Sequence, residues 1–225
     1  MVDSQCVRDK LTIGMFGLTL NVLLHLGRHP GRTVEYSFAL ENIGTETRKL
    51  LDVGSSGSIF PLKMARMGFK VTAADMRPYC KTHPNLKFVR GDLKTLPFLD
   101  ESFDAVTCIS TIEHVGLSAY GDPKHDYGDS LTVDEFRRVL EPGGRLILTT
   151  PYSSKYQLLK WKNAHERIYN KEKISTLFAR WKKLREDYYV CMRWQDWRRS
   201  TEEEATKTYP SYPRCNLYCF VFEKT

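Results

Sequence analysis

Residues 49–61 read KLLDVGSSGSIFP, an apolar run that ends in the acid Asp52 and then enters a turn of small residues. A short apolar run followed by glycine is typical of a buried parallel strand. Turns that bind dinucleotides carry three glycines in the pattern GxGxxG, whereas here Gly54 is followed by Ser56 and Ile59 at the other two positions. The turn therefore argues against a pyrophosphate site.

Strand patterns and helix patterns alternate on either side of this turn. Residues 58–68 and 131–140 have the apolar spacing of helices, and the second stops at EPGG, a strong helix breaker. Further strands are expected at 70–75, 86–92, 102–110 and 145–151. This alternation predicts an α/β fold, a doubly wound and mainly parallel sheet with helices on both faces.

The chain beyond residue 151 has a different pattern. We expect a helix in KEKISTLFARW (171–181), followed by strands in LREDYYVCMRW (184–194) and NLYCFVFEK (216–224) with no clear helix between them. Two strands in such succession predict an antiparallel end to the sheet. We interpret residues 1–225 as one domain, with a helical cap (1–45), a cofactor-binding core (46–152) and a basic, aromatic part (153–225) that completes the sheet and the substrate side.

The composition is that of an ordinary globular domain, with 225 residues and a hydrophobic fraction of 41%. The six cysteines are scattered, and Cys108 lies inside an apolar run, so we expect all of them to be reduced and the protein to be cytoplasmic. Cys191, Cys215 and Cys219 lack a fourth ligand and the spacing of a zinc site. The apolar segment 11–27 contains His25 and is too short to span a bilayer, so we expect an amphipathic helix there.

The positive charge is concentrated in one stretch. The whole chain has a net charge of +7, and residues 151–200 hold 13 Lys and Arg against 5 Asp and Glu, a balance of +8. All four tryptophans lie in the same stretch. Basic residues among aromatic ones occur on nucleic-acid surfaces, but they occur more often on a solvated face whose aromatic side chains point inward. A nucleic-acid partner is therefore possible and not favoured.

Acids close three successive strands. Asp52, Asp75 and Asp92 end the strands at 49–53, 70–75 and 86–92, and the carboxyl ends of parallel strands are where open α/β sheets bind ligands. An acid about 20 residues after the turn binds ribose hydroxyls in nucleotide-binding units, which assigns Asp75 to a ribose. Asp92 is placed for an adenine amino group, with Leu93 against the base. S-adenosylmethionine has an adenosine and no phosphate, so it tolerates the serines, and Asp52 suits its methionine ammonium.

The motifs in combination resemble a known family. LLDVGSSGS, VTAAD, GDLKTLPFLDESFDAVTCISTIEHV and VLEPGGRLILTTP are similar, in this order, to the motif series of the class I, seven-stranded S-adenosylmethionine-dependent methyltransferases, in the type 11 branch. The resemblance covers about residues 35–152 and implies an antiparallel final strand at 216–224. Ser56 and Ser58 depart from the family, which usually has glycine there. The expected cofactor-binding residues are Asp52, Gly54, Ser55, Ser56, Asp75, Met76, Asp92, Leu93, Ser110 and Tyr36, the last as an aromatic over the cofactor.

The segment STIEHVGLSAYGDPKHDYGD (110–129) is expected to face the transferred methyl group. The candidate catalytic residues are His114, Glu113 and Tyr120. A histidine near its free pKa can take a hydroxyl proton at neutral pH, so His114 is the first candidate for a general base, and the alternative is that it only orients the cofactor. The acids and histidines here lack a diagnostic metal-ligand spacing, so we expect no metal.

The acceptor is less defined than the cofactor. EHVGLSAYGDP resembles a subset of these enzymes linked with sugar and cell-surface glycan modification, and EHVG partly resembles cyclopropane fatty-acid synthases. We expect O-methylation of a small molecule or glycan. Two alternatives remain open: an RNA methyltransferase that uses residues 151–200, and a non-catalytic protein that binds S-adenosylmethionine.

Overall fold

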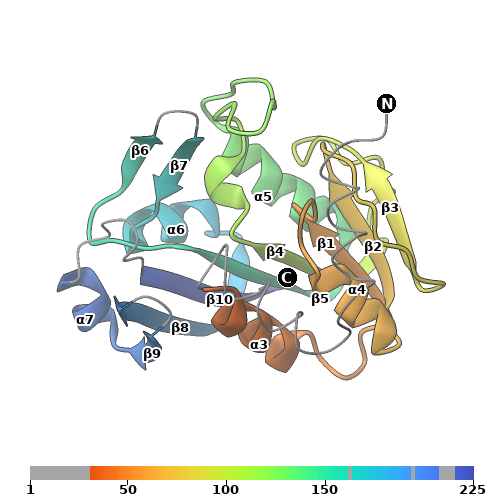
Figure 1. The fold of residues 1–225 in the computed structure, drawn as a ribbon, viewed down its shortest axis with the longest axis horizontal. Helices are drawn as coiled ribbons and strands as arrows, with labels where there is room; N and C mark the ends of the chain where they lie inside the picture. Colours follow the sequence, from red (N-terminus) through yellow and green to blue (C-terminus); the bar gives the residue numbers. More distant parts are fainter. Residues whose placement is uncertain (1–30, 162–163, 194–195, 208–215) are drawn as a thin grey trace.

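The computed structural model describes residues 31–161, 164–193, 196–207 and 216–225. Its main sheet has eight strands in the order β3-β2-β1-β4-β5-β10-β8-β9 (Figure 1). The strands are β1 (Lys49–Val53), β2 (Lys70–Asp75), β3 (Leu86–Arg90), β4 (Phe103–Ile109), β5 (Leu140–Pro151), β8 (Trp181–Arg193), β9 (Asp196–Ser200) and β10 (Asn216–Lys224). The seven strands expected from the family resemblance are present, and β9 is an eighth strand at the edge.

The first five strands are parallel, as their apolar runs predicted. β1 lies between β2 and β4, with Leu50 opposite Val71 on one side and Ala105 on the other. β10 runs antiparallel between β5 and β8, which confirms the antiparallel final strand. The order reverses direction at β1, so the carboxyl ends of β1 and β4 diverge at a topological switch point, where open α/β sheets bind ligands.

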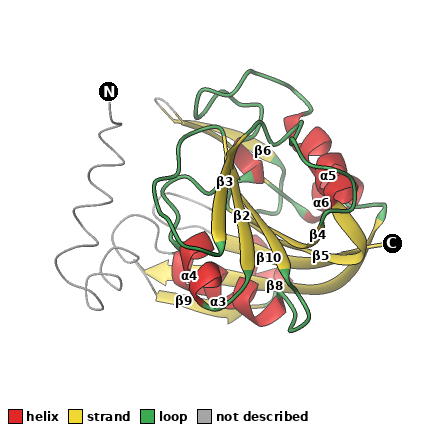
Figure 2. Cartoon of the chain, turned by 90° about the vertical axis from the view of Figure 1, so that its right-hand side faces the viewer, coloured by secondary structure: helices red, strands yellow, loops and turns green. Residues whose placement is uncertain are grey.

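Helices cover both faces of the sheet (Figure 2). On one side lie α3 (Arg32–Asn42) and α4 (Phe60–Arg66), and on the other α5 (Gly128–Val139) and α6 (Lys171–Leu177). Because successive strand residues point to opposite faces, Leu146 and Leu148 join the core beneath α5 while Ile147 joins the core beneath α3. The doubly wound, Rossmann-like fold is confirmed. A short helix, α7 (Glu202–Lys207), packs through Ala205 on the α5 side.

Helix α5 and strand β5 meet without the expected loop. α5 ends at Val139, as EPGG predicted, but β5 already begins at Leu140, so the breaker lies inside the strand. The register of β5 against β4 shifts between Phe103 and Ala105, and Gly143 has φ +77° there. The glycines thus form a bulge in a strand rather than a connecting loop.

A two-stranded hairpin stands apart from the main sheet. It consists of β6 (Gln157–Trp161) and β7 (Ala164–Ile168), which are antiparallel, and it was not predicted from the sequence. In Figure 1 it lies beside the loop that follows β4. The buried Arg167 of β7 donates to the Val115 carbonyl at 2.7 Å and lies 3.6 Å from Asp129 of α5, so the hairpin is attached to the loop that carries the candidate catalytic residues.

Three expectations on the chain outside the sheet have different outcomes. The helix expected at 11–27 lies outside the described residues, and of the expected cap only α3 is described. The expectation that all cysteines are reduced is wrong for Cys80, which is disulfide-bonded, whereas Cys108, Cys191 and Cys219 are free and buried. In the described part of the chain, no helix is both long and apolar enough to cross a bilayer.

Candidate functional site

The turn after β1 uses its serines in hydrogen bonds. The Ser56 amide donates to Asp75 Oδ2 at 2.9 Å, which ties the turn to the end of β2. The Ser58 hydroxyl accepts from the Phe60 amide (3.1 Å) at the start of α4 and lies 3.1 Å from the hydroxyl of Tyr36. The serines that replace family glycines therefore hold the turn between β2, α3 and α4.

Gly54 is required by a close neighbour. Its φ of +71° is in the left-handed region, and a Cβ at this position would lie 2.2 Å from Thr111 Oγ1. Thr111 follows β4, so the absence of a side chain at Gly54 lets the loops after β1 and β4 meet. Any larger residue at position 54 would push these two loops apart.

Asp75 at the end of β2 and Asp92 after β3 already have partners, and Asp75 is buried whereas Asp92 is partly exposed. Asp75 accepts from the Arg77 amide at 2.8 Å, besides the Ser56 amide. Asp92 accepts from the Lys94 amide (3.0 Å) and forms an ion pair with the Lys94 ammonium at 2.9 Å. Asp75 ends β2 as expected, whereas β3 ends at Arg90, so Asp92 lies two residues beyond the strand that it was expected to close.

Asp52 is buried at the centre of this edge. Its Oδ1 accepts a hydrogen bond from Thr107 Oγ1 of β4 at 2.7 Å. Burial raises the pKa of Asp52 to about 7, although the hydrogen bond from Thr107 and the charge of Arg32 act in the opposite direction. Near neutral pH, Asp52 is therefore protonated in a large share of the molecules, which is unusual for an aspartate.

Helix α3 adds a buried ion pair that sequence reasoning missed. Glu35 accepts from Arg32 (3.1 Å), from Thr149 Oγ1 (2.7 Å) and from the hydroxyl of Ser110. Arg32 also donates to the Ile109 carbonyl at 3.3 Å. The pair thus holds α3 over the ends of β4 and β5. The only signal in the sequence was the three-residue spacing of an Arg and a Glu on one helix.

Two further expected cofactor residues lie at this edge. Tyr36 packs its ring on Phe60 at 5.1 Å, beside the turn after β1. Ser110 has φ +42°, a conformation that a residue other than glycine rarely adopts, and it is the first residue of the segment 110–129 that carries the candidate catalytic residues. Of the remaining expected residues, Leu93 and Ser55 are buried and the Met76 carbonyl accepts from Arg90 at 2.8 Å.

Glu113 lies in a single 3-10 turn, η1 (Ile112–His114), directly after β4. The residue is buried, and its Oε2 has no hydrogen-bond partner among the described residues. Burial raises the pKa of Glu113 well above its ordinary value, and the nearby charges of Glu166 and Glu35 raise it further. Burial therefore favours the protonated form of Glu113, and Oε2 retains unused hydrogen-bonding capacity within the described residues.

His114 has a defined tautomer. Its Nδ1 lies 2.9 Å from the carbonyl oxygen of His165 in β7, and a carbonyl only accepts, so Nδ1 carries the proton. Burial lowers the pKa of His114, and the cations Arg32 and Arg77 lower it too, while the carbonyl and Asp122 raise it. The ring is therefore neutral at pH 7, and Nε2 has a free lone pair.

Tyr120 lies against His114. The two rings meet edge to face with centroids 5.1 Å apart, and Tyr120 is 47% exposed. The guanidinium carbon of Arg77 lies 4.2 Å from the centroid of the Tyr120 ring. The three residues expected to be catalytic are thus near one another. The described residues contain no group of three or more His, Cys, Asp or Glu side chains that would hold a metal ion.

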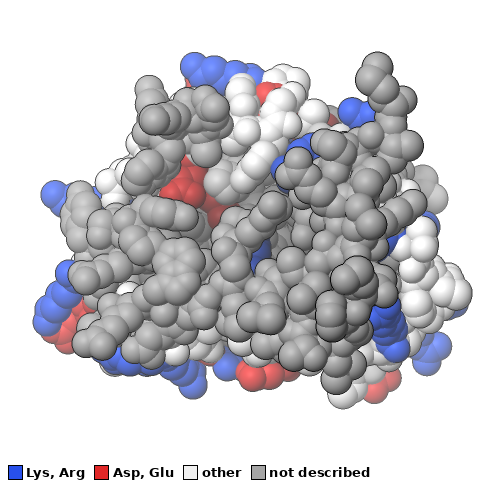
Figure 3. All heavy atoms as spheres, in the orientation of Figure 1, with Lys and Arg blue, Asp and Glu red and all other residues white. Residues whose placement is uncertain are grey.

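The basic stretch 151–200 is largely neutralised by acids. Apart from Lys155, every Lys and Arg in it whose side chain the structure describes lies within ion-pair distance of a carboxylate, as with Lys171 and Glu202 at 2.7 Å and Lys182 and Glu223 at 2.9 Å. On the face seen in Figure 3, Lys and Arg atoms lie at the periphery in separate groups with acidic atoms among them. Among the described residues of this face, the cations do not join into the continuous positive groove that a nucleic-acid strand needs.

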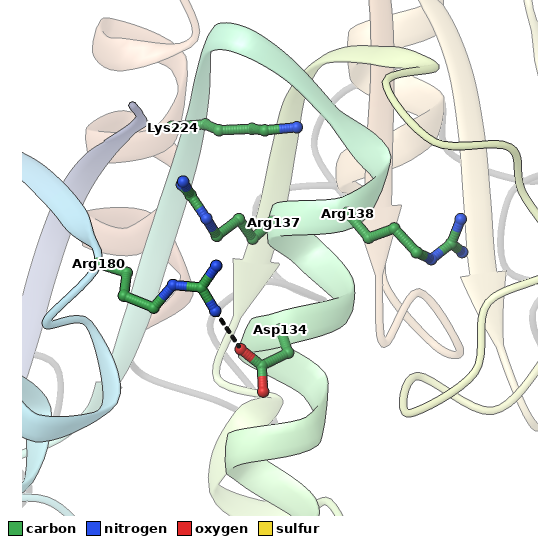
Figure 4. Close-up of a pocket in the computed structure, with 5 residues that line it drawn as sticks. All are labelled: Asp134, Arg137, Arg138, Arg180 and Lys224. Atoms are coloured by element: carbon green, nitrogen blue, oxygen red, sulfur yellow. Dashed lines mark ion pairs between the residues drawn. The ribbon is translucent and has the colours of Figure 1, made fainter.

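A cavity of about 300 Å³ lies away from these residues, near the end of α5. It is lined by Asp134, Arg137, Arg138, Arg180 and Lys224. In Figure 4, Arg138 extends to the opposite side of α5 from Arg137 and Arg180, and Arg180 faces Asp134 at 3.8 Å. Because β5 begins directly after α5, this cavity is at the amino ends of the parallel strands, opposite the candidate site.

A comparison with family models assigns the central part of the chain. Residues 51–148 match the family model described as "Methyltransferase domain". The matched segment runs from β1 to β5, so it includes the turn, the three acids and η1. This confirms the resemblance to the type 11 branch that the motifs indicated.

The similarity to curated relatives extends over only part of this chain and part of each relative. The chain is 30% identical over 132 residues to a ubiquinone biosynthesis O-methyltransferase of Xanthomonas oryzae pv. oryzae, covering 54% of this chain and 51% of the relative. It is 31% identical over 163 residues to a demethylmenaquinone methyltransferase of Chlorobaculum parvum, covering 66% of this chain and 63% of that protein. The chain thus spans between half and two thirds of the length of these two relatives.

Solved structures share the fold. The 1,6-didemethyltoxoflavin-N1-methyltransferase of Burkholderia thailandensis superposes with a TM-score of 0.63 at 14% identity, over 98% of this chain and 88% of that one. That protein was solved with 1,6-didemethyltoxoflavin and S-adenosylhomocysteine bound. The likeness shows that the present chain has the fold of class I methyltransferases.

Proposed function

Because residues 51–148 are a methyltransferase domain, we propose that the protein is an S-adenosylmethionine-dependent methyltransferase that acts on a hydroxyl group of a small molecule or glycan. The observation that carries the proposal is the neutral His114 in the turn directly after β4, whose Nδ1 is fixed on the His165 carbonyl at 2.9 Å. The following steps are derived from residues of this chain.

The residues present at the strand ends fit the cofactor. The turn after β1 supplies one left-handed glycine and hydroxyls instead of a phosphate cradle, which suits a ligand without phosphates. Asp75 and Asp92 would accept from the ribose and the adenine amino group, and Asp52 from the ammonium of the methionine tail. The buried Oε2 of Glu113 has no described partner, which is a further sign of a place meant for a polar ligand. Arg32, whose charge acts on Asp52, would attract the tail's carboxylate.

When bound, S-adenosylmethionine supplies a methyl carbon already activated by a positive sulfur. Residues of the chain then need to orient the acceptor and to remove its proton. The free lone pair of His114 Nε2 would take the proton of an acceptor hydroxyl. In its protonated form, which burial favours, Glu113 would donate a hydrogen bond to the acceptor. Tyr120 would exclude water from one side of His114.

The acceptor class is supported by the relatives. Both are named for steps that modify quinone precursors, and one is named an O-methyltransferase, so a small molecule with a ring hydroxyl is the first candidate. A glycan hydroxyl is the second candidate, because Tyr120 is a half-exposed aromatic ring next to polar side chains. RNA is less well supported, because acids neutralise most described cations of residues 151–200.

The first test has two steps. Calorimetry with S-adenosylhomocysteine measures cofactor binding, and incubation with methyl-labelled S-adenosylmethionine and a panel of phenols, sugars and RNA measures transfer. We expect binding and label in a hydroxyl of the first two classes. His114→Gln should keep the binding and reduce transfer by about 100-fold or more, the range of general-base catalysis.

His125→Gln is the matched control, since His125 lies in the same loop and is exposed. Transfer by His125→Gln should equal that of the wild type. Binding without transfer to any acceptor class would instead support the non-catalytic alternative, and transfer that is unaffected by His114→Gln would remove the general base from the proposal.

A further inference from the structure

Arg77 lies two residues after Asp75 and contacts both oxygens of its carboxylate. Its amide donates to Oδ1 at 2.8 Å, and its guanidinium donates to Oδ1 at 3.3 Å and to Oδ2 at 3.5 Å. The amide bonds from Arg77 and Ser56 are short, whereas the two guanidinium bonds are at the weak end of the range. The side chain of Arg77 is therefore the partner that Asp75 can exchange most easily.

The same guanidinium has a second partner on another loop. It stacks on the ring of Tyr120 at 4.2 Å, and that ring contacts His114 edge to face at 5.1 Å. The loop that carries Tyr120 is held by Asp122, which accepts from the Gly116 amide at 2.6 Å and from the Tyr120 amide at 3.4 Å. Arg77 thus connects the loop after β2 with the loop after β4.

Several charged groups surround His114, and Arg77 is one of the few that can move. Arg32 of α3 is fixed by Glu35, and Asp122 is fixed by two amides. Glu166 follows His165 in β7, and Glu113 precedes His114 in η1. The side chain of Arg77 is 39% exposed, and its contacts are a long ion pair and a ring.

We propose that Arg77 is a positioning residue with two partners: it holds the Tyr120 ring against His114, and it occupies Asp75 until the ribose of a bound nucleoside replaces it there. The inference rests on the proposed function, since it assigns the ribose to Asp75. A ribose diol brings two hydroxyl donors to a carboxylate whose strongest sites are already taken by amides. The guanidinium then stays on Tyr120, where a cation on a ring is favourable, and its charge is no longer balanced by Asp75.

Two measurements test the proposal without a known acceptor. Calorimetry gives the Kd of S-adenosylhomocysteine, and NMR titration of the imidazole signals gives the pKa of His114, assigned by comparison with His114→Gln. In the wild type, we expect S-adenosylhomocysteine to lower the pKa of His114. In Arg77→Gln, the pKa of His114 should be higher than in the wild type, and the nucleoside should change it less.

The same variants separate the two partners of Arg77. Arg77→Gln should bind S-adenosylhomocysteine as tightly as the wild type or up to several-fold more tightly, because a competitor for Asp75 is removed. Tyr120→Phe keeps the ring and should leave the pKa of His114 and its response to the nucleoside as in the wild type. Tyr120→Leu should abolish that response. Arg77→Lys keeps the charge and should leave the pKa of His114 close to the wild-type value.

Arg90→Gln is the matched control, because the Arg90 guanidinium holds the same loop through the Met76 carbonyl. Arg90 pairs with Asp75 through the backbone of β3, and its guanidinium has no described bond to the Asp75 carboxylate or the Tyr120 ring. This variant should change neither measurement. A Kd weakened more than tenfold in Arg77→Gln would overturn the exchange at Asp75, and an unchanged His114 pKa would overturn the link to His114. A wild type that does not bind S-adenosylhomocysteine would overturn the proposed function itself, whatever Arg77 does to His114.

Discussion

Two regions of the molecule contain buried carboxylates, and they differ in how many cations and hydrogen-bond donors contact these groups. In the C-terminal part, Asp187 of β8 accepts from Arg185 at 2.6 Å and from Arg199 of β9, so two cations balance one buried acid. At the strand ends, Asp52 is buried with one hydroxyl donor, and Glu113 keeps an oxygen without a described partner. Partners offset the cost of burying an acid, whereas an unbalanced buried acid lowers stability and is retained where a ligand supplies the missing partner.

Among the variants that test this difference between the two regions, we expect the largest effect at Asp52. An acid whose folded pKa is raised to about 7 keeps its proton while the unfolded chain has lost it, so the free energy of unfolding falls as the pH rises from about 4 to 7. The free energy of unfolding should fall by about 4 kcal/mol over this pH range because of Asp52. Asp52→Asn has no proton to lose, so this contribution should be absent in the variant. Urea unfolding of both proteins between pH 4 and 8 measures this difference.

Two parallel stability curves would mean that Asp52 is ionised in the folded protein and is as well balanced as Asp187. S-adenosylhomocysteine, which retains the ammonium of the methionine tail, should reduce the pH dependence of the wild type. This addition distinguishes an acid kept for a ligand from an acid that is only poorly solvated.

Removal of the balanced acid should destabilise the protein at every pH at which Asp187 is ionised. Asp187→Ala leaves Arg185 and Arg199 without their shared acceptor, and we expect a loss of about 3 kcal/mol in the free energy of unfolding at pH 7. The two arginines are partly exposed, so water offsets some of the cost. Cofactor binding per mole of folded protein should be unchanged, and a large loss of binding would show that the two regions are coupled.

Asp75 is intermediate between the two kinds, because Arg77 balances it only through long contacts. Asp75→Ala should weaken binding of S-adenosylhomocysteine by about 1–3 kcal/mol through the lost hydrogen bonds to the ribose. Calorimetry measures the change, with Asp100→Ala as the control, since Asp100 is exposed and binds Arg138. Unchanged affinity would mean that the ribose lies elsewhere.

The smallest effect is expected for an exposed ion pair. Glu223 faces Lys182 at 2.9 Å near the surface, and Glu223→Ala should lower the free energy of unfolding by less than about 1 kcal/mol. The same urea assay compares it directly with Asp187→Ala. A loss as large as that of Asp187→Ala would show that burial does not separate the two classes of pair.

The parallel strands and their acids were predictable because local signals encode them. An apolar run that stops at an acid or glycine defines each strand, and parallel strands bring their carboxyl ends to one edge, so Asp52, Asp75 and Asp92 were found without a structure. His114 followed from the segment after β4. The family motifs then supplied the antiparallel order at the end of the sheet.

The partners of these residues were not predictable. Glu35 meets Thr149 and His114 meets the His165 carbonyl across more than 50 residues, and no local pattern encodes such contacts. The β6–β7 hairpin was missed because residues 157–168 are rich in charges and lack a long apolar alternation. The disulfide of Cys80 was missed because isolated cysteines do not reveal their pairing.

The position of β10 has a consequence for synthesis of the protein. Residues 216–224 lie between β5 and β8 in the sheet, although every other strand is made before them. On the ribosome, β1 to β5 can pair as they emerge, but β8 has no neighbour on its inner side until this last strand leaves the exit tunnel. The backbone edge of β8 that later pairs with β10 is therefore unpaired in the nascent chain, and an unpaired strand edge favours association with other chains.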